Sequence, residues 1–298
     1  MGSQIAYRLQ DTGLDVTVLS RGQRLEYIKR YGIMLESFEG GSRSSRKVNV
    51  IERLTPLDQY DLVIVALGKN YYPGVLPFLV ANIYTPNVLF LGNNAAGPGA
   101  IVNRIERERV LLGFPMMRGT IQGRVIRYAD GFKPSITVGE LDGGESERIE
   151  WVKELLEFAG FDVDVCPNME VWLKYHAAVI LALAAAYMRV EGDFDRLSKD
   201  RGGLTLMFKA MREGFSVLKE LGYPMLPERL KRLEWGPLNL VTLYAGRMLK
   251  NREMEYVFTH CDAMQGELRV LNKEFTEILR STSILTPAYD ELSEYLPK

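Results

Sequence analysis

The feature that most constrains the fold is an alternation of short β-rich runs with amphipathic stretches over the first 167 residues. Such alternation is typical of βαβ units, which build a mostly parallel sheet. The predicted strands are residues 15–19, 47–51, 61–67, 87–91, 109–114 and 161–165, and the predicted helices are residues 2–11, 21–30, 72–82, 98–106 and 146–160. An Asp130-Gly131 turn between two β-rich runs predicts a hairpin over residues 123–139.

The second part of the chain has a different residue pattern. From residue 169 to residue 297 the pattern is helical almost throughout, with breaks at glycines and prolines. We therefore predict two domains, residues 1–167 and residues 168–298. The longest apolar segment, residues 177–188, is shorter than the ~20 residues that span a bilayer, so we expect a buried helix there. The polar residues 39–46 are predicted to form a surface turn.

Composition removes several classes of function. The 37 Lys and Arg residues nearly balance the 38 Asp and Glu residues, so no overall field favours nucleic acid or an anionic membrane as a partner. Only two cysteines and two histidines occur, which argues against a disulfide framework and a metal site. No signal-peptide pattern opens the sequence. We expect a cytoplasmic protein without a metal.

The N-terminal residues resemble part of a nucleotide-binding motif. A small residue, Gly2, is followed by an amphipathic helix, a glycine turn, a β-run and then Arg21. This is the second half of a dinucleotide-binding βαβ unit, in which Gly2 fits the last glycine of the fingerprint. The first strand and the other two glycines are expected upstream of Met1. The alternative is a helix that simply begins at Gly2.

The residue after the second strand of such a unit distinguishes the two nicotinamide cofactors. An acidic residue there binds the ribose hydroxyls of NAD, whereas an arginine accommodates the 2′-phosphate of NADP. Here the strand ends at Ser20-Arg21, and Arg24 follows. This favours NADP(H), although arginine is also common after surface strands. The expected fold class is α/β: a Rossmann-type parallel sheet domain that lacks its first strand, followed by an all-α domain.

The order and spacing of several motifs resemble the ketopantoate reductase (ApbA/PanE-like) family. The motifs are DVTVLSRGQRL, DLVIVALGKN, NVLFLGNNAAG, GELDGG, Trp172-Leu173-Lys174 and a late helix with Glu267. The resemblance implies a Rossmann domain and a helical domain for substrate binding and dimerisation, with the active site in the cleft between them. It also implies an NADPH-dependent reduction of a 2-keto acid or related carbonyl compound. A homodimer is left open.

The resemblance also assigns roles to residues. Lys174 matches the family's general acid, and Glu267 matches the glutamate that positions the substrate or the lysine. Asn93 and Lys69 are assigned to the cofactor, although Gly68 shifts Lys69 by one position. The alternative for Lys174 is a surface lysine whose head reaches water.

Two further residues are assigned to the substrate. Asn94 lies in the same Asn-rich loop as Asn93, and an ordinary turn is the alternative there. His260 shares a helical face with Glu267, and a half-buried histidine bonded to backbone is the alternative for it.

The sequence departs from the family at positions that would hold the substrate. Ala178 and Ala182 stand where the family has asparagines, and the family's late serine falls near Glu255. We therefore expect a roomier, less polar pocket and a bulkier substrate than ketopantoate. The alternative function is a non-catalytic NADP(H)-binding sensor or scaffold. A helical partner-binding protein is a third interpretation.

Overall fold

The computed structural model describes residues 1–41, 43–117, 119–129, 133–250 and 264–298 of the chain. Its contacts divide the chain into two compact units. The first unit contains residues 1–67, 71–92 and 99–169, and the second contains residues 68–70, 93–98 and 170–298. The two short loops that join the second unit were not separated by the sequence analysis, which placed a single boundary at residue 167.

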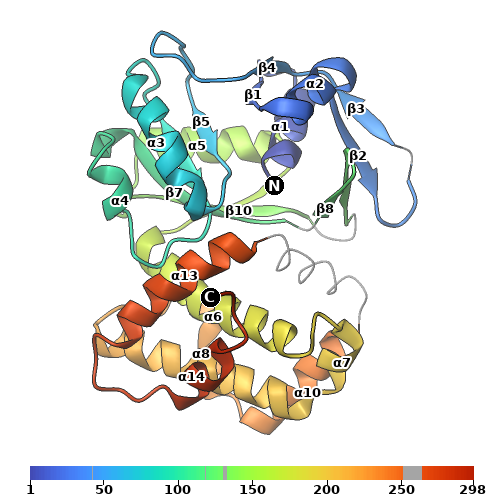
Figure 1. The fold of residues 1–298 in the computed structure, drawn as a ribbon. Coiled ribbons are helices and arrows are strands. Elements are labelled where there is room, and N and C mark those ends of the chain that lie inside the picture. Colours follow the sequence, from blue (N-terminus) through green and yellow to red (C-terminus); the bar gives the residue numbers. More distant parts are fainter. Residues whose placement is uncertain (42, 118, 130–132, 251–263) are drawn as a thin grey trace. The chain divides into compact units, whose positions relative to one another are not determined.

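The first unit is a mixed α/β structure (Figure 1). Its helices are α1 (Gly2–Asp11), α2 (Gly22–Tyr31), α3 (Tyr72–Ala81), α4 (Gly99–Val102) and α5 (Glu147–Phe158), with the 3-10 turn η2 (Arg107–Arg109). The 3-10 turn η1 (Lys69–Tyr71) begins in the second unit and ends in the first. Its strands are β1 (Thr17–Leu19), β2 (Ile33–Ser37), β3 (Ser44–Arg46), β4 (Asn49–Ile51), β5 (Val63–Val65), β6 (Val88–Leu91), β7 (Val110–Met116), β8 (Gly119–Gln122), β9 (Val125–Tyr128), β10 (Ser135–Glu140) and β11 (Asp162–Val165). The predicted fold class is confirmed.

The main sheet has the strand order β11-β10-β7-β6-β5. All its neighbouring strands are parallel except β10 and β7. β6 is buried along its whole length, because its unbroken run of apolar residues is covered on both faces. The loop after β6 therefore leaves the carboxyl end of a central strand, where ligands of open α/β sheets bind.

The parallel strands β1 and β4 form a separate two-stranded sheet. In a Rossmann sheet of order 3-2-1-4-5-6, β4, β1 and β5 correspond to the third, second and fourth strands, so the first strand would pair with both β1 and β5. No described strand pairs with those two edges. Leu19 at the end of β1 is 43% exposed, which is high for a residue of a central strand. The arrangement agrees with the expected lack of a first strand.

The predicted hairpin over residues 123–139 is wrong. Strand β9 pairs with β8 and β2, whereas β10 pairs with β7 and β11 in a different sheet. The tight turn is at Gly123, which has a φ of +61° and connects β8 to β9. Ile136 and Val138 on β10 are fully buried, so this strand gains more by packing in the main sheet. Strands β2, β3 and β8 were not predicted, and β3 lies within the expected surface turn.

The second unit is helical (Figure 1). Its elements are α6 (Met169–Arg189), α7 (Phe194–Lys199), α8 (Arg201–Glu220), η3 (Glu228–Leu230), α9 (Lys231–Trp235), α10 (Leu238–Met248), α13 (Gln265–Leu279) and α14 (Pro287–Ser293). Among the described residues, α6 is the one helix long and apolar enough to cross a membrane, and 72% of its most apolar window is buried in the structure. This burial is that of a helix at the centre of a globular core.

Candidate functional site

A group of buried polar side chains lies within the second unit, and we call it the polar cluster. Its members are Lys69, Asn93, Asn94, Lys174, Glu267 and Glu274. They come from η1, from the loop after β6, and from helices α6 and α13. Burying so many polar groups is costly unless they bond to one another. All but Glu274 were predicted from the sequence.

Lys174 is almost fully buried on α6, with a relative exposure of 3%. Its Nζ atom donates to the carbonyl oxygen of Ala95 at 2.8 Å and lies 2.9 Å from Oε1 of Glu170, one helical turn earlier. The ammonium also lies 5.5 Å from the centre of the Tyr223 ring, within the range of a cation–π contact. An ammonium has three N–H donors, so one is left beyond the two that these oxygens accept. The alternative of a lysine head in water is wrong.

Glu267 begins the helix α13 and binds Asn93. Its Oε1 accepts a hydrogen bond from the Asn93 side-chain amide at 2.8 Å and from the Asn93 backbone N–H at 3.4 Å. Burial raises the pKa of the Glu267 carboxyl above its ordinary value, while these two hydrogen bonds oppose the rise. The carboxyl is therefore closer to accepting a proton near neutral pH than an exposed glutamate.

Lys69 is bound by two partners in the polar cluster. Its Nζ donates to Oδ1 of Asn94 at 2.6 Å and lies 2.5 Å from Oε1 of Glu274. The other carboxylate oxygen of Glu274 accepts from the backbone N–H of Ala96 at 3.2 Å. Burial lowers the pKa of Lys69 below its ordinary value. The Glu274 carboxylate opposes this shift, and the positive charge of Lys174 lowers the pKa further.

Glu274 was missed by the sequence analysis. It lies seven residues after Glu267 on α13, and residues at this spacing share a face of a helix. The same periodicity placed His260 and Glu267 on one face, and extending it forward by two turns would have found Glu274. His260 itself lies outside the described residues.

Two asparagines of the polar cluster each leave one polar atom without a hydrogen-bond partner in the structure. The atoms are Oδ1 of Asn93 and Nδ2 of Asn94, and both are buried. Glu267 needs a donor and Lys69 needs an acceptor, so the orientation of both amides is fixed by their partners. Buried polar atoms are rarely left unpaired, because each costs free energy. The pair therefore keeps one unused acceptor and one unused donor.

His176 lies on α6, two residues after Lys174. Its ring stacks on Trp172 with a centroid distance of 5.1 Å. Burial, with a smaller effect from Arg229, lowers the pKa of His176 to about 3. The ring is therefore neutral at physiological pH.

Two of the residues expected to bind the cofactor, Gly2 and Arg21, lie in the first unit, whereas Lys69 and Asn93 lie in the second. A Cβ added to Gly2 would lie 3.2 Å from Cβ of Ala66, so α1 begins in close contact with the end of β5. Close helix–strand packing is the role of the last glycine in the fingerprint. No side chain caps α1 and its first turn is free of acidic residues, which suits the anionic pyrophosphate of a dinucleotide.

Two arginines lie near the start of α2. Arg21 precedes the helix, is exposed, and places its guanidinium over the ring of Phe78. Arg24 donates to the Ser3 hydroxyl of α1 at 2.9 Å. Both cations thus lie at the amino end of a helix after β1, and these residues fit a nucleotide that carries a 2′-phosphate.

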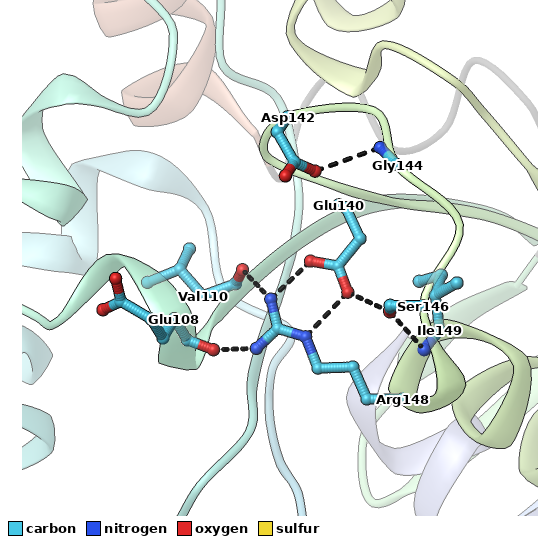
Figure 2. A network of polar contacts seen from close by, with 8 residues as sticks. All are labelled: Glu108, Val110, Glu140, Asp142, Gly144, Ser146, Arg148 and Ile149. Atoms are coloured by element: carbon cyan, nitrogen blue, oxygen red, sulfur yellow. Dashed lines mark hydrogen bonds and ion pairs between the residues drawn. The ribbon is translucent and has the colours of Figure 1, made fainter.

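The GELDGG motif forms a structural network around Glu140 (Figure 2). Arg148 binds both oxygens of the Glu140 carboxylate, with its Nε at 2.7 Å, and also binds the backbone carbonyls of Glu108 and Val110. The Ser146 hydroxyl donates to Glu140 and caps α5 by accepting from the Ile149 N–H. The network fixes the loop between β10 and α5 within the first unit.

The expected roomier pocket at Ala178 and Ala182 is wrong. Both alanines are 1% exposed and belong to the core of the second unit. A Cβ added to Gly214 of α8 would lie 3.0 Å from Cβ of Ala178, so the helices α6 and α8 approach closely there. An asparagine at position 178 would be forced into this helix contact. The alanines therefore serve helix packing.

Comparison with known proteins identifies a family and two relatives that match part of the chain. Residues 1–143 match the family model described as ketopantoate reductase PanE/ApbA. An uncharacterized oxidoreductase, YkpB of Bacillus subtilis (strain 168), is 27% identical over 180 residues, which cover 59% of this chain and 58% of the relative. A 2-dehydropantoate 2-reductase of Pyrococcus horikoshii is 26% identical over 176 residues, covering 58% and 55%. The chain thus matches little more than half the length of these relatives.

A solved structure resembles nearly the whole chain. The ternary structure of D-mandelate dehydrogenase with NADH and anilino(oxo)acetate has a TM-score of 0.81 at 16% identity, covering 99% of this chain and 93% of that one. At this identity the likeness shows the fold. Together the comparisons confirm the predicted resemblance to ketopantoate reductases, a group of oxidoreductases.

Proposed function

We propose that the chain is an NADPH-dependent reductase of a carbonyl compound, with Lys174 as the general acid. The observation that carries the proposal is the buried Lys174 ammonium, which is fixed by Ala95 and Glu170 and keeps one N–H donor unused. The substrate-orienting pair Asn93 and Glu267 belongs to the same unit. A lysine buried on an apolar helix is costly, and a reaction that needs a positioned proton explains it.

Carbonyl reduction requires a hydride on carbon and a proton on oxygen. The reduced nicotinamide supplies the hydride when it is bound. As the carbonyl oxygen takes up negative charge, the Lys174 ammonium stabilises it and transfers its third proton to it. Glu170, whose side chain is 39% exposed, lies 2.9 Å from Lys174 Nζ and provides a route for a proton from solvent to restore the ammonium.

Arg21 and Arg24 support the choice of NADPH. An exposed guanidinium after β1, where an acidic residue would serve NADH, favours a 2′-phosphate. The test is a fluorescence titration of the protein with NADPH and with NADH. Arg21→Ala should weaken NADPH binding about tenfold and leave NADH binding unchanged, because one charge-assisted contact contributes ~1.4 kcal/mol. Arg53→Ala, at an exposed arginine, is the matched control.

The general acid is tested by Lys174→Met, assayed with a panel of ketones, 2-oxo acids and their esters. Turnover should fall by about a hundredfold or more while NADPH binding is retained. Lys209→Met, at an exposed lysine of α8, should leave both unchanged. Equal turnover in the Lys174 variant and the parent would contradict the proposed role.

A second candidate function is a non-catalytic NADP(H) sensor. It is favoured by the packing of Ala178 and Ala182, which leaves no amide at two positions where ketopantoate reductases hold substrate. A parent protein that binds NADPH but reduces no compound of the panel would support the sensor. A parent that binds neither nucleotide would contradict both functions.

A further inference from the structure

We propose that the polar cluster selects uncharged carbonyl compounds over 2-oxo carboxylates, and that Glu274 sets this selectivity. The inference rests on the proposed reductase function and names its substrate class. Glu274 was not among the residues that the sequence motifs assigned to the site.

The first argument is the charge of the cluster. The two ammonium groups, Lys69 and Lys174, each already lie within 2.9 Å of a carboxylate, from Glu274 and Glu170 respectively. Glu267 adds a third carboxylate. Even with Glu267 protonated, these described groups sum to zero, and with Glu267 ionised they sum to one negative charge. A substrate carboxylate entering the cluster therefore meets no excess of positive charge.

The second argument is the rigidity of Glu274. Its side chain is only 14% exposed, and both of its oxygens are engaged, one by Lys69 and the other by the Ala96 N–H. Such a carboxylate does not move aside at low cost, because leaving these donors unpaired and buried is unfavourable. Its negative charge thus stays beside Lys69 and offsets the charge of this ammonium.

The third argument is the chemistry of the groups left over. Asn93 Oδ1 can only accept a hydrogen bond and Asn94 Nδ2 can only donate one. A carboxylate offers acceptors alone, so it would satisfy Asn94 and face Asn93 with a like partial charge. A neutral group with both a donor and an acceptor, such as a primary amide, satisfies both atoms.

The test compares two unreactive ligands of nearly equal shape, oxamate and oxamide, by calorimetric titration of the NADPH-loaded protein. Oxamate carries a carboxylate where oxamide carries an amide. In the parent we expect oxamide to bind at least about tenfold more tightly, since one like charge nearby is enough for this difference. Tighter binding of oxamate by the parent, or binding of neither ligand, would overturn the proposal.

Variants assign the selectivity to Glu274. Glu274→Gln keeps the shape and an oxygen for Lys69 or the Ala96 N–H, and it should raise oxamate affinity about tenfold with little effect on oxamide. Lys69→Met leaves Glu274 without its cation and should weaken oxamate binding below the parent. Glu277→Gln, at an exposed glutamate of the same helix, is the control. If the ratio of oxamate affinity to oxamide affinity were the same in Glu274→Gln as in the parent, the assignment to Glu274 would be overturned.

A parallel assay separates this inference from the proposed function. The rates of NADPH oxidation with pyruvate and with ethyl pyruvate report both catalysis and charge preference. Selective oxamide binding without turnover of either compound would uphold the inference and contradict the reductase function. Faster turnover of pyruvate than of ethyl pyruvate would support the reductase function and contradict the inference.

Discussion

The Glu267 carboxylate binds the side chain and the backbone N–H of Asn93, a residue 174 positions earlier in the chain. This contact connects the first turn of α13 to the loop that follows β6, and both belong to the second unit. Each residue is almost fully buried, at 7% and 4% exposure. The loop conformation in the polar cluster therefore depends on a carboxyl whose charge is disfavoured by burial.

This relationship predicts a pH-dependent stability difference for Glu267→Gln. The folded-state pKa of Glu267 is raised, so the parent keeps this group's full contribution below the unfolded pKa and loses it as the pH rises through the folded pKa. Glutamine does not titrate and still accepts from Asn93. The free energy of unfolding of the variant, measured in urea between pH 4 and pH 8, should therefore improve relative to the parent as the pH rises.

The control is Glu277→Gln on the same helix, where the side chain is exposed. Its free energy of unfolding should differ from that of the parent by no more than about 0.5 kcal/mol across this pH range. A Glu267→Gln difference that did not vary with pH would show that Glu267 titrates alike in the folded and unfolded chain.

His176 gives a second prediction, which proton NMR can check. Since its pKa is lowered to about 3, its ring signals should not shift between pH 8 and pH 5, and the signals can be assigned by their loss in His176→Gln. A lowered pKa means that this group's contribution to stability is present above the unfolded value of 6.5 and is lost as the pH falls toward 3. A titration midpoint near 6.5 in the folded protein would contradict the prediction.

The close approach of α6 and α8 gives a third prediction. A Cβ at Gly214 would lie 3.0 Å from Cβ of Ala178 and 3.1 Å from Cζ of Phe275, both in the buried core. Gly214→Ala should therefore lower the free energy of unfolding by about 1–3 kcal/mol, the usual cost of overpacking.

Gly202→Ala is the matched control for this helix. A Cβ there meets only an ordinary contact with Asp200 at 3.6 Å, and alanine favours a helix. It should leave stability unchanged or raise it by up to about 1 kcal/mol. Urea denaturation of both variants provides the comparison, and equal effects would show that the helices can separate without cost.

The sequence was most informative where one local pattern determines the structure. Helices α1, α3 and α5 and strands β6 and β11 follow from periodicity or from unbroken apolar runs. The hairpin prediction failed because burial decides in which of the two sheets a strand pairs. A local turn signal does not encode this choice. In the polar cluster, motif order located Lys174 and Glu267. Helical spacing offers Glu274 as a candidate, but its ion pair with Lys69 and that of Glu170 with Lys174 required three-dimensional contacts, because glutamates on helices are usually solvated.

The network around Glu140 gives the last prediction, and it concerns the first unit (Figure 2). The Glu140 side chain is 7% exposed and binds Arg148 with both oxygens. Glu140→Gln removes the charge but keeps the shape, so Arg148 loses its counter-charge within a partly buried site. The free energy of unfolding should fall by about 1–3 kcal/mol.

The ion pair between Glu150 and Lys153 on the same helix is the matched control. The Glu150 side chain is 53% exposed, and exposed pairs contribute little, so Glu150→Gln should change stability by less than about 0.5 kcal/mol. Salt distinguishes the Glu140–Arg148 pair from the Glu150–Lys153 pair, because screening weakens exposed ion pairs more than buried ones. The loss in Glu140→Gln should therefore persist in 0.5 M NaCl, and its disappearance there would show that water reaches the Glu140 carboxylate freely.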